Sequence, residues 1–296
     1  MRALVIGASG QIGAALAEVL TTRGHVVVGT HHGHPDPRTH PLDLHDVDAV
    51  ESMVEAAAAD WVFCPAGLTA VDHCEDHEDE ARALNRDGPA AAARAAARRG
   101  AGFLFYSTDY VFDGAAGPYG EDAVPHPISV YGRSKLEGEH AVRVANPRAV
   151  IVRTNVVYGA HRDEKNFVYA VLRAVRAGTP MRVVTDQRSN PTYGPDLAAA
   201  SAELAERGLL GVINVAGDAV LPRLDFARLV CDEFGLDPGL LVPVTTAELN
   251  QRAPRPLWAG LTIDRARGLL ATPLRGPRAG LTAMRQALEA AAERPR

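Results

Sequence analysis

The feature that most constrains the fold of this chain is a glycine-rich turn near its start. Residues 7–13 read Gly-Ala-Ser-Gly-Gln-Ile-Gly, after an apolar run at 3–6 and before good helix sequence at 14–20. A second apolar run follows at 26–28. A strand, a glycine turn, a helix and a second strand within about thirty residues form the βαβ unit of a dinucleotide-binding fold.

Each glycine of this turn has a physical role. Gly7 permits the tight turn, Gly10 lets the backbone approach a pyrophosphate, and Gly13 lets the helix pack closely on the sheet. The pyrophosphate would lie at the helix N-terminus, where free N–H groups and the helix dipole favour an anion. The spacing is Gly-x-x-Gly-x-x-Gly, so the position between strand and helix supports this interpretation more than the glycines alone do.

Buried strands and helices continue to alternate along the first half of the chain. Apolar runs at 61–64, 103–106 and 149–153 are typical of strands, and the sequences at 47–58 and 89–99 are typical of helices. This pattern predicts an α/β fold, a Rossmann-like doubly wound parallel sheet with a smaller C-terminal α/β substrate lobe. We expect the NAD(P)-binding domain to comprise residues 1–158 and about 192–217, and the substrate lobe to comprise about 159–191 and 218–296.

Composition argues against several classes of protein. The chain has 296 residues and a formal net charge of −5, which gives no reason to expect nucleic-acid binding. Its three cysteines form no Cys-x-x-Cys motif, so we expect a reducing compartment rather than a disulfide framework. No apolar run reaches the roughly 18 residues of a membrane helix, and the apolar start is too short for a signal peptide. We therefore expect a cytoplasmic protein.

A tyrosine and a lysine four residues apart are the main candidates for catalysis. Tyr131 and Lys135 would share one face of a helix, where the ammonium could stabilise a tyrosinate and lower the tyrosine pKa. Thr108 ends a buried strand upstream, at the sheet edge where ligands bind, and its hydroxyl could hold a carbonyl oxygen. Such a trio suits hydride transfer to a carbonyl. Tyr-x-x-x-Lys also occurs often by chance, so this spacing alone does not identify a catalytic pair.

A histidine-rich loop follows the second strand. Many dinucleotide folds have an acidic residue here for the adenine ribose, but residues 29–34 read Gly-Thr-His-His-Gly-His. His31 or His32 could contact a 2′-phosphate, which favours NADPH over NADH. The alternative is a metal site, although the Pro/Gly-rich loop lacks a regular ligand spacing.

The stretch at 72–80 is dense in acidic residues, with His73, Cys74 and His77 interleaved. A metal site is one interpretation of this pattern. A solvated helix face or a subunit contact explains it more simply.

Motifs matching one known family occur in order along nearly the whole chain. They are GASGQIG at 7–13, STDYVFDG at 107–114, YGRSK at 131–135, RTNVVYG at 153–159, PTYGPDLA at 191–198 and PRP at 254–256. The sequence resembles the extended short-chain dehydrogenase/reductases, specifically the dTDP-4-dehydrorhamnose reductase (RmlD-like) family. The resemblance implies NADPH- or NADH-dependent reduction of a 4-keto group on a nucleotide-linked deoxysugar, without a catalytic metal, and by analogy a possible homodimer.

The resemblance also assigns roles to individual residues. Thr108 would occupy the Ser/Thr catalytic position, Tyr131 would donate the proton, and Lys135 would bind the nicotinamide ribose and lower the Tyr131 pKa. The implied cofactor-binding residues are Gly7, Ser9, Gly10, Gln11 and Ile12 at the pyrophosphate, His31, Asp43 and Leu44 near the adenosine, and Ala66 and Gly67 along the cofactor. The implied substrate-binding residues are Thr108, Asp109, Tyr110 and Asn155 at the sugar, with Arg188, Thr192 and Arg255 toward the nucleotide diphosphate.

Departures from the family pattern are concentrated on the substrate side. Val156 stands where these reductases often have tryptophan, and residues 257–262 differ from the usual sequence after PRP. A ketoreductase for another nucleotide sugar in secondary metabolism is therefore an alternative. A further alternative is a non-catalytic NADP-binding subunit, since the chain also resembles the regulatory β subunit of methionine adenosyltransferase.

Overall fold

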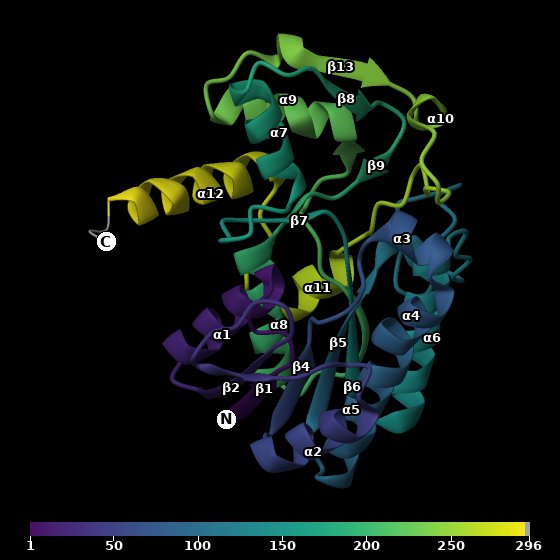
Figure 1. The fold of residues 1–296 in the computed structure, drawn as a ribbon, viewed down its shortest axis with the longest axis vertical. Coiled ribbons are helices and arrows are strands. Elements are labelled where there is room, and N and C mark those ends of the chain that lie inside the picture. The colour runs from purple at the N-terminus through teal and green to yellow at the C-terminus, as the bar shows by residue number, and fades with distance from the viewer. Residues whose placement is uncertain (294–296) are drawn as a thin grey trace.

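The computed structural model describes residues 1–293, and its centre is a seven-stranded parallel sheet (Figure 1). The order is β11-β6-β5-β4-β1-β2-β3, so the direction of winding reverses between β1 and β4. The bounds are β1 (Arg2–Val5), β2 (Val26–His31), β3 (Thr39–Pro41), β4 (Trp61–Cys64), β5 (Gly102–Thr108), β6 (Ala149–Thr154) and β11 (Gly211–Asn214). Strand β5 pairs with β6 in a register that sets Ser107 beside Arg153 and Thr108 beside Thr154.

Helices cover both faces of this sheet, which is why its strands are continuous apolar runs rather than alternating ones. Helices α1 (Gln11–Thr22) and α8 (Gly194–Glu206) pack on one face, against the side chains of Val5, Phe63 and Leu104. The opposite face is covered by α2 (Val47–Ala57), α5 (Gly88–Arg98) and α6 (Val130–Ala145). The prediction of a Rossmann-like doubly wound sheet is confirmed.

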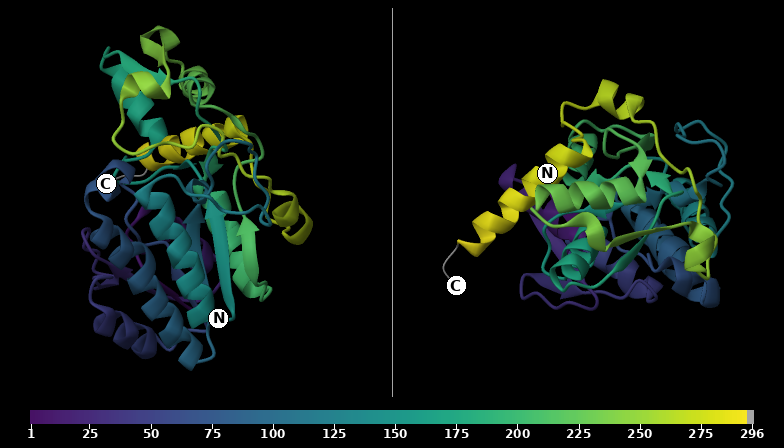
Figure 2. Two further views of the ribbon diagram at one scale, coloured as in Figure 1. Left: turned by 90° about the vertical axis from the view of Figure 1, so that its right-hand side faces the viewer. Right: turned by 90° about the horizontal axis from the view of Figure 1, so that it is seen from above.

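A second, smaller layer lies beyond the carboxyl ends of the sheet strands (Figure 1). It contains α7 (Phe167–Arg176), β8 (Met181–Val184), α9 (Arg223–Glu233) and β13 (Leu241–Val244). Its own apolar core includes Leu172, Phe226 and Leu281. Helix α12 (Pro277–Ala292) lies at the junction of the two layers in both side views (Figures 1 and 2).

Short elements connect the two layers. Two strand pairs are β7 (Val157–Tyr158) with β10 (Thr192–Tyr193), and β9 (Arg188–Ser189) with β12 (Leu221–Pro222). The polar stretch at 186–193 thus contains two short strands. The remaining elements are α3 (Val71–Asp76), α4 (Glu78–Arg82), the π-helix η1 (Ala83–Asp87), η2 (Asp109–Val111), η3 (Pro238–Leu240), α10 (Thr246–Leu249) and α11 (Asp264–Leu269).

The sequence pattern did not predict β3 or β13. β3 and β13 contain prolines and only a few residues each, so they carry little periodic signal. Within residues 1–293, no helix combines the length and the hydropathy needed to cross a bilayer.

Candidate active site

A cavity of about 810 Å³ lies at the carboxyl ends of β1, β4 and β5. This is the point where the strand order reverses, and open α/β sheets bind their ligands in the crevice at such a point. Most of the predicted site residues line it, and these are Gly7, Ser9, Gly10, Gln11, Ile12, His31, Asp43, Leu44, Ala66, Gly67, Thr108, Asp109, Tyr110, Tyr131, Lys135, Asn155 and Arg188. One continuous cavity therefore joins the glycine turn to the catalytic candidates.

The glycine turn has the geometry of an anion cradle. Gly7 has a φ of +91°, and its N–H donates to Thr30 Oγ1 at 3.1 Å. A Cβ on Gly13 would lie 2.1 Å from the Gly7 carbonyl oxygen, so only glycine allows α1 to approach the turn this closely. Gly10 is the N-cap of α1, where a Cβ would point into nearly open space. The first N–H groups of α1 thus start at the cavity wall, as a diphosphate group requires.

The adenosine end of the cavity combines histidines with one carboxylate. His31 Nδ1 lies 2.7 Å from Thr39 Oγ1, and His32 Nε2 lies 3.7 Å from an oxygen of Asp43. Asp43 accepts the backbone N–H of His45, which lowers the pKa of its carboxyl group. Residues 29–34 contain no acidic side chain, but the fold brings the Asp43 carboxylate to the same wall. Asp43 was predicted near the adenosine, but the preference for NADPH was based on residues 29–34 alone.

The trio of Thr108, Tyr131 and Lys135 is buried and faces the cavity. Thr108 ends β5, where its hydroxyl accepts the N–H of Tyr110 at 3.2 Å. Ser129 caps α6 by accepting the N–H of Gly132, which orients the helix that carries Tyr131 and Lys135. The sequence prediction that these side chains share one site agrees with this arrangement.

The electrostatics of Tyr131 differ from the prediction. Burial raises the pKa of Tyr131, and the nearby Asp109 carboxylate raises it further. The predicted lowering of the Tyr131 pKa by Lys135 is not found, because burial dominates at the phenol. The Lys135 Nζ lies 4.1 Å from the centre of the Phe105 ring. Burial also lowers the pKa of Lys135, to about 8. The phenol is therefore fully protonated at neutral pH, which is the form that a proton donor needs.

The substrate end of the cavity has polar atoms without partners. Asn155 Nδ2 donates to Asp109 at 3.0 Å, and burial raises the pKa of Asp109 to about 6. Asn155 Oδ1 and Thr154 Oγ1 are buried and have no hydrogen-bond partner within the described part of the chain. Buried polar atoms of this kind are costly unless a ligand satisfies them.

Two predicted substrate residues do not line the cavity. Thr192 Oγ1 donates to the Asn190 carbonyl and accepts the N–H of Gly217, so it fastens a connection between the layers. Arg255 is buried in an ion pair with Asp72 at 3.0 Å. Arg188, in contrast, is exposed on the cavity wall with its guanidinium carbon 5.7 Å from the centre of the Trp258 ring.

The sequence reading missed several residues of the site. Asn85 in η1 accepts the N–H of Leu68 and donates to the Leu68 carbonyl and to Ser134 Oγ, which fixes the loop after β4 against α6. Gln187 and Arg223 line the substrate end. No local motif marks these positions, because their roles depend on contacts between distant segments.

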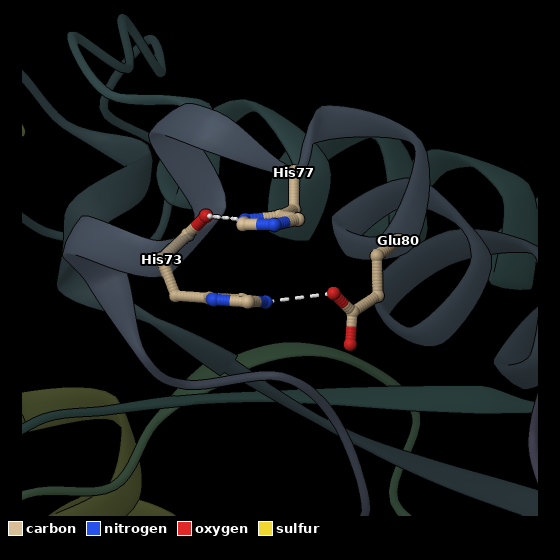
Figure 3. A group of neighbouring side chains, drawn as sticks. All are labelled: His73, His77 and Glu80. Carbon is tan, nitrogen blue, oxygen red and sulfur yellow. Dashed lines mark hydrogen bonds and ion pairs between the residues drawn. The ribbon is translucent and has the colours of Figure 1, made fainter.

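A cluster of His73, His77 and Glu80 lies on α3 and α4 (Figure 3). His73 Nε2 is 2.7 Å from Glu80, and His77 Nδ1 is 3.0 Å from the His73 carbonyl oxygen. The two imidazole rings are stacked 3.8 Å apart with an interplanar angle of 9°. Lone pairs in parallel rings do not converge on one ion, so this geometry matches a hydrogen-bonded surface cluster better than a metal centre.

Comparisons with known proteins agree with this geometry. The family model described as the RmlD substrate binding domain matches residues 1–290. A probable low-salt glycan biosynthesis reductase from Haloferax volcanii is 36% identical over 277 residues, covering 91% of this chain and 92% of the relative. The dTDP-4-dehydrorhamnose reductase of Mycobacterium tuberculosis is 38% identical over 287 residues, with 95% and 91% covered.

A solved structure is similar over almost the whole chain. The Bacillus anthracis dTDP-4-dehydrorhamnose reductase, determined in complex with NADP, superimposes with a TM-score of 0.88 at 28% identity. The match covers 97% of this chain and 99% of the other. The chain therefore belongs to the RmlD-like family of extended short-chain dehydrogenase/reductases, in which the dTDP-4-dehydrorhamnose reductases are found.

Proposed function

We propose that the protein is an NAD(P)H-dependent reductase of a 4-keto nucleotide-linked deoxysugar, with dTDP-4-dehydrorhamnose as the first candidate substrate. The observation that carries this proposal is the single cavity that joins the glycine cradle to Thr108, Tyr131 and Lys135. The named reductase from Mycobacterium tuberculosis and the NADP complex from Bacillus anthracis support the reaction class and the cofactor.

The residues at the cofactor end fit a dinucleotide. The turn at Gly7 and Gly10 brings the start of α1 to the cavity, where the backbone N–H groups of Gln11 and Ile12 would bind a diphosphate, with Ser9 beside them. Gly67 faces the Lys135 ammonium, because a Cβ at that position would lie 3.8 Å from Lys135 Nζ. Gly67 and Lys135 both line the cavity, and the ammonium would bind the hydroxyl groups of a ribose there. His31, His32 and Asp43 line the adenosine end, and we propose NADPH as the preferred cofactor and NADH as the alternative.

The mechanism assigns one task to each residue of the trio. The nicotinamide supplies a hydride to the keto carbon when the cofactor is bound. Tyr131 holds the proton on its phenol oxygen and delivers it to the carbonyl oxygen, so that the ketone becomes an alcohol. The Thr108 hydroxyl would orient that carbonyl oxygen, and Lys135 would hold the ribose of the cofactor. The unpartnered oxygens of Thr154 and Asn155 would accept hydrogen bonds from the sugar hydroxyl groups.

We further propose that the two layers divide these tasks. Residues 1–158 with about 192–217 would bind the cofactor, and about 159–191 with 218–293 would bind the nucleotide end of the substrate. We also propose a cytoplasmic location and a homodimer. Size-exclusion chromatography with light scattering would decide between a monomer and a dimer.

The experiment is a reduction assay with the cofactor and the sugar varied separately. Oxidation of NADPH and of NADH is followed by absorbance with dTDP-4-dehydrorhamnose made in situ, and then with a UDP-linked 4-keto sugar. Faster oxidation with dTDP-4-dehydrorhamnose would support the proposal, and faster oxidation with the UDP sugar would redirect it to another nucleotide sugar. Tight cofactor binding without turnover on either sugar would contradict a reductase and favour a regulatory binding subunit.

A further inference from the structure

Arg223 is a cation on the cavity wall that the protein itself leaves unpaired. It is the first residue of α9, and its backbone N–H donates to the Gln187 carbonyl at 2.9 Å. Across residues 1–293, its guanidinium makes no ion pair within 4.0 Å and no hydrogen bond. Its guanidinium carbon lies 4.9 Å from the centre of the Phe167 ring.

Arg223 is partly buried, and two more deeply buried guanidinium groups in the described structure are neutralised. Arg153 makes two hydrogen bonds with Glu139, and Arg255 pairs with Asp72. Burial lowers the pKa of Arg223, as expected for a cation that has lost water without gaining a partner. Leaving such a group unsatisfied is costly, so an anionic ligand is the simplest partner for it.

The position of Arg223 identifies which end of the cavity it serves. The charged or ionisable groups that act on it are Asp109, Tyr110 and Arg255. Asp109 already accepts from Asn155 and Thr108 and lies beyond ion-pair distance. α9 belongs to the upper layer in Figure 1, whereas the glycine cradle precedes α1 in the lower one. Arg223 therefore faces the substrate end and not the pyrophosphate of the cofactor.

We propose that Arg223 binds the phosphate that joins the sugar to the nucleotide, and so determines specificity for nucleoside diphosphate sugars. This inference rests on the proposed function and assigns a residue that the family motifs do not include. The planar guanidinium matches two phosphate oxygens at once, and the Phe167 ring restricts its orientation.

Arg188 lies one strand away and completes the proposed phosphate-binding wall. The pairing of β9 with β12 sets Arg188 opposite Pro222, next to Arg223 in the chain. Arg188 is exposed beside Trp258, whereas Arg223 is only partly exposed. Arg223 thus reaches the phosphate near the sugar, and Arg188 reaches the phosphate near the nucleoside.

The test measures dTDP binding to the NADP⁺-saturated protein by calorimetry, so that the cofactor phosphates are already in place. We compare wild type, Arg223→Met, Arg223→Lys and Arg228→Met. Arg228 lies on the same helix, is exposed and pairs with Asp225, so it controls for the loss of a positive charge on α9. Thymidine and inorganic phosphate serve as ligands that lack one part of dTDP.

We expect Arg223→Met to weaken dTDP binding about 10- to 100-fold, the range for hydrogen bonds between charged groups. Thymidine and NADP⁺ should bind as in wild type, which also shows that the variant is folded. Arg223→Lys should recover part of the loss, and Arg228→Met should show none. In turnover, the KM for the nucleotide sugar should rise while kcat changes only a few-fold.

Two results would overturn the inference while leaving the reductase intact. One is equal dTDP affinity in Arg223→Met and Arg228→Met, and the other is a loss of NADP⁺ affinity in Arg223→Met, which would assign the residue to a cofactor phosphate. A wild-type protein that binds NADP⁺ but neither dTDP nor UDP would instead overturn the proposed function, and this inference with it.

Discussion

Two groups of charged side chains both include a residue of α6, and they differ in how completely they are paired. In the first group, Glu139 accepts from Ser107 and makes two hydrogen bonds with Arg153, at 2.7 and 2.9 Å. In the second group, Lys135, Asp109 and Arg223 face the cavity without an ion pair between them in the described structure. We call these the closed group and the open group.

The difference separates stability from binding. Lys135 and Glu139 lie one turn apart on the same helix, yet Glu139 is satisfied by the protein and Lys135 is not. The closed group joins α6 to β5 and β6, so its interactions are complete before any ligand binds. The charges of the open group have no partner in the protein, and this incomplete pairing costs stability. A bound ligand could supply the missing interactions. We expect changes in the closed group to affect folding and changes in the open group to affect binding and turnover.

The largest expected effect is on turnover, at the tyrosine beside the open group. Tyr131→Phe should lower the reduction rate about 10²- to 10⁴-fold, the typical contribution of general acid catalysis, with cofactor binding retained. Stopped-flow or steady-state assays with a fluorescence titration of NADPH measure both quantities. Tyr158→Phe, whose hydroxyl bonds to a carbonyl in α12 outside the cavity, is the control. Unchanged rates in Tyr131→Phe would remove it as the proton donor.

The closed group should give the largest effect on stability. Glu139→Gln leaves Arg153 buried and without its anionic partner, and breaking a buried pair typically costs about 3–5 kcal/mol. Glu137→Gln is two residues away on α6, where its pairs with Arg82 and Arg86 are solvent-exposed, and it should cost no more than about 1 kcal/mol. Urea unfolding of both variants measures the difference. Equal losses of unfolding free energy in the two variants would contradict a larger contribution of the closed group to stability.

The contribution of Asp109, in the open group, to the free energy of unfolding should depend on pH. Its pKa is higher in the folded protein, about 6, than the ordinary 3.8, so the folded state holds the proton more tightly. Its contribution to the free energy of unfolding is therefore present at low pH and is lost as the pH rises through about 6, by roughly 3 kcal/mol in all. The unfolding free energy of Asp109→Asn, relative to wild type, should be higher at pH 8 than at pH 4. Parallel profiles for the two proteins would contradict the raised pKa.

The smallest expected effect is at Lys135. Lys135→Ala should weaken NADPH binding about 10- to 100-fold and slow turnover in parallel, because one ammonium holds the ribose and acts near Tyr131. In wild type the affinity should fall as the pH rises through about 8, where the ammonium loses its proton. Lys135→Arg stays charged and should abolish that pH dependence. A change confined to substrate affinity would show that the assignment is wrong.

The parts of the fold and site that sequence could predict are those encoded by short-range patterns. The glycine turn, the buried strands and the Tyr131–Lys135 spacing are local, and each lies where it was expected. The lowered Tyr131 pKa was not found, because four-residue spacing says nothing about burial. Thr192 and Arg255 do not line the cavity, and the sequence could not indicate this because their partners Gly217 and Asp72 are distant in sequence. No sequence pattern marks Asn85 or Arg223, because their roles depend on tertiary contacts. The roles of the individual site residues and the domain boundaries stay predictions.

The walls of the cavity come from residues as far apart as Ile6 and Ala259, and this has a consequence for the newly made chain. The ribosome releases the glycine turn, Thr108, Tyr131 and Lys135 before it releases Arg188, Arg223 and the segment around Pro256. Domains form from the N-terminus as they are made. Because α8 packs on α1, the wall around the glycine turn is complete only once residues 194–206 have been made, which is still before Arg223 and the segment around Pro256.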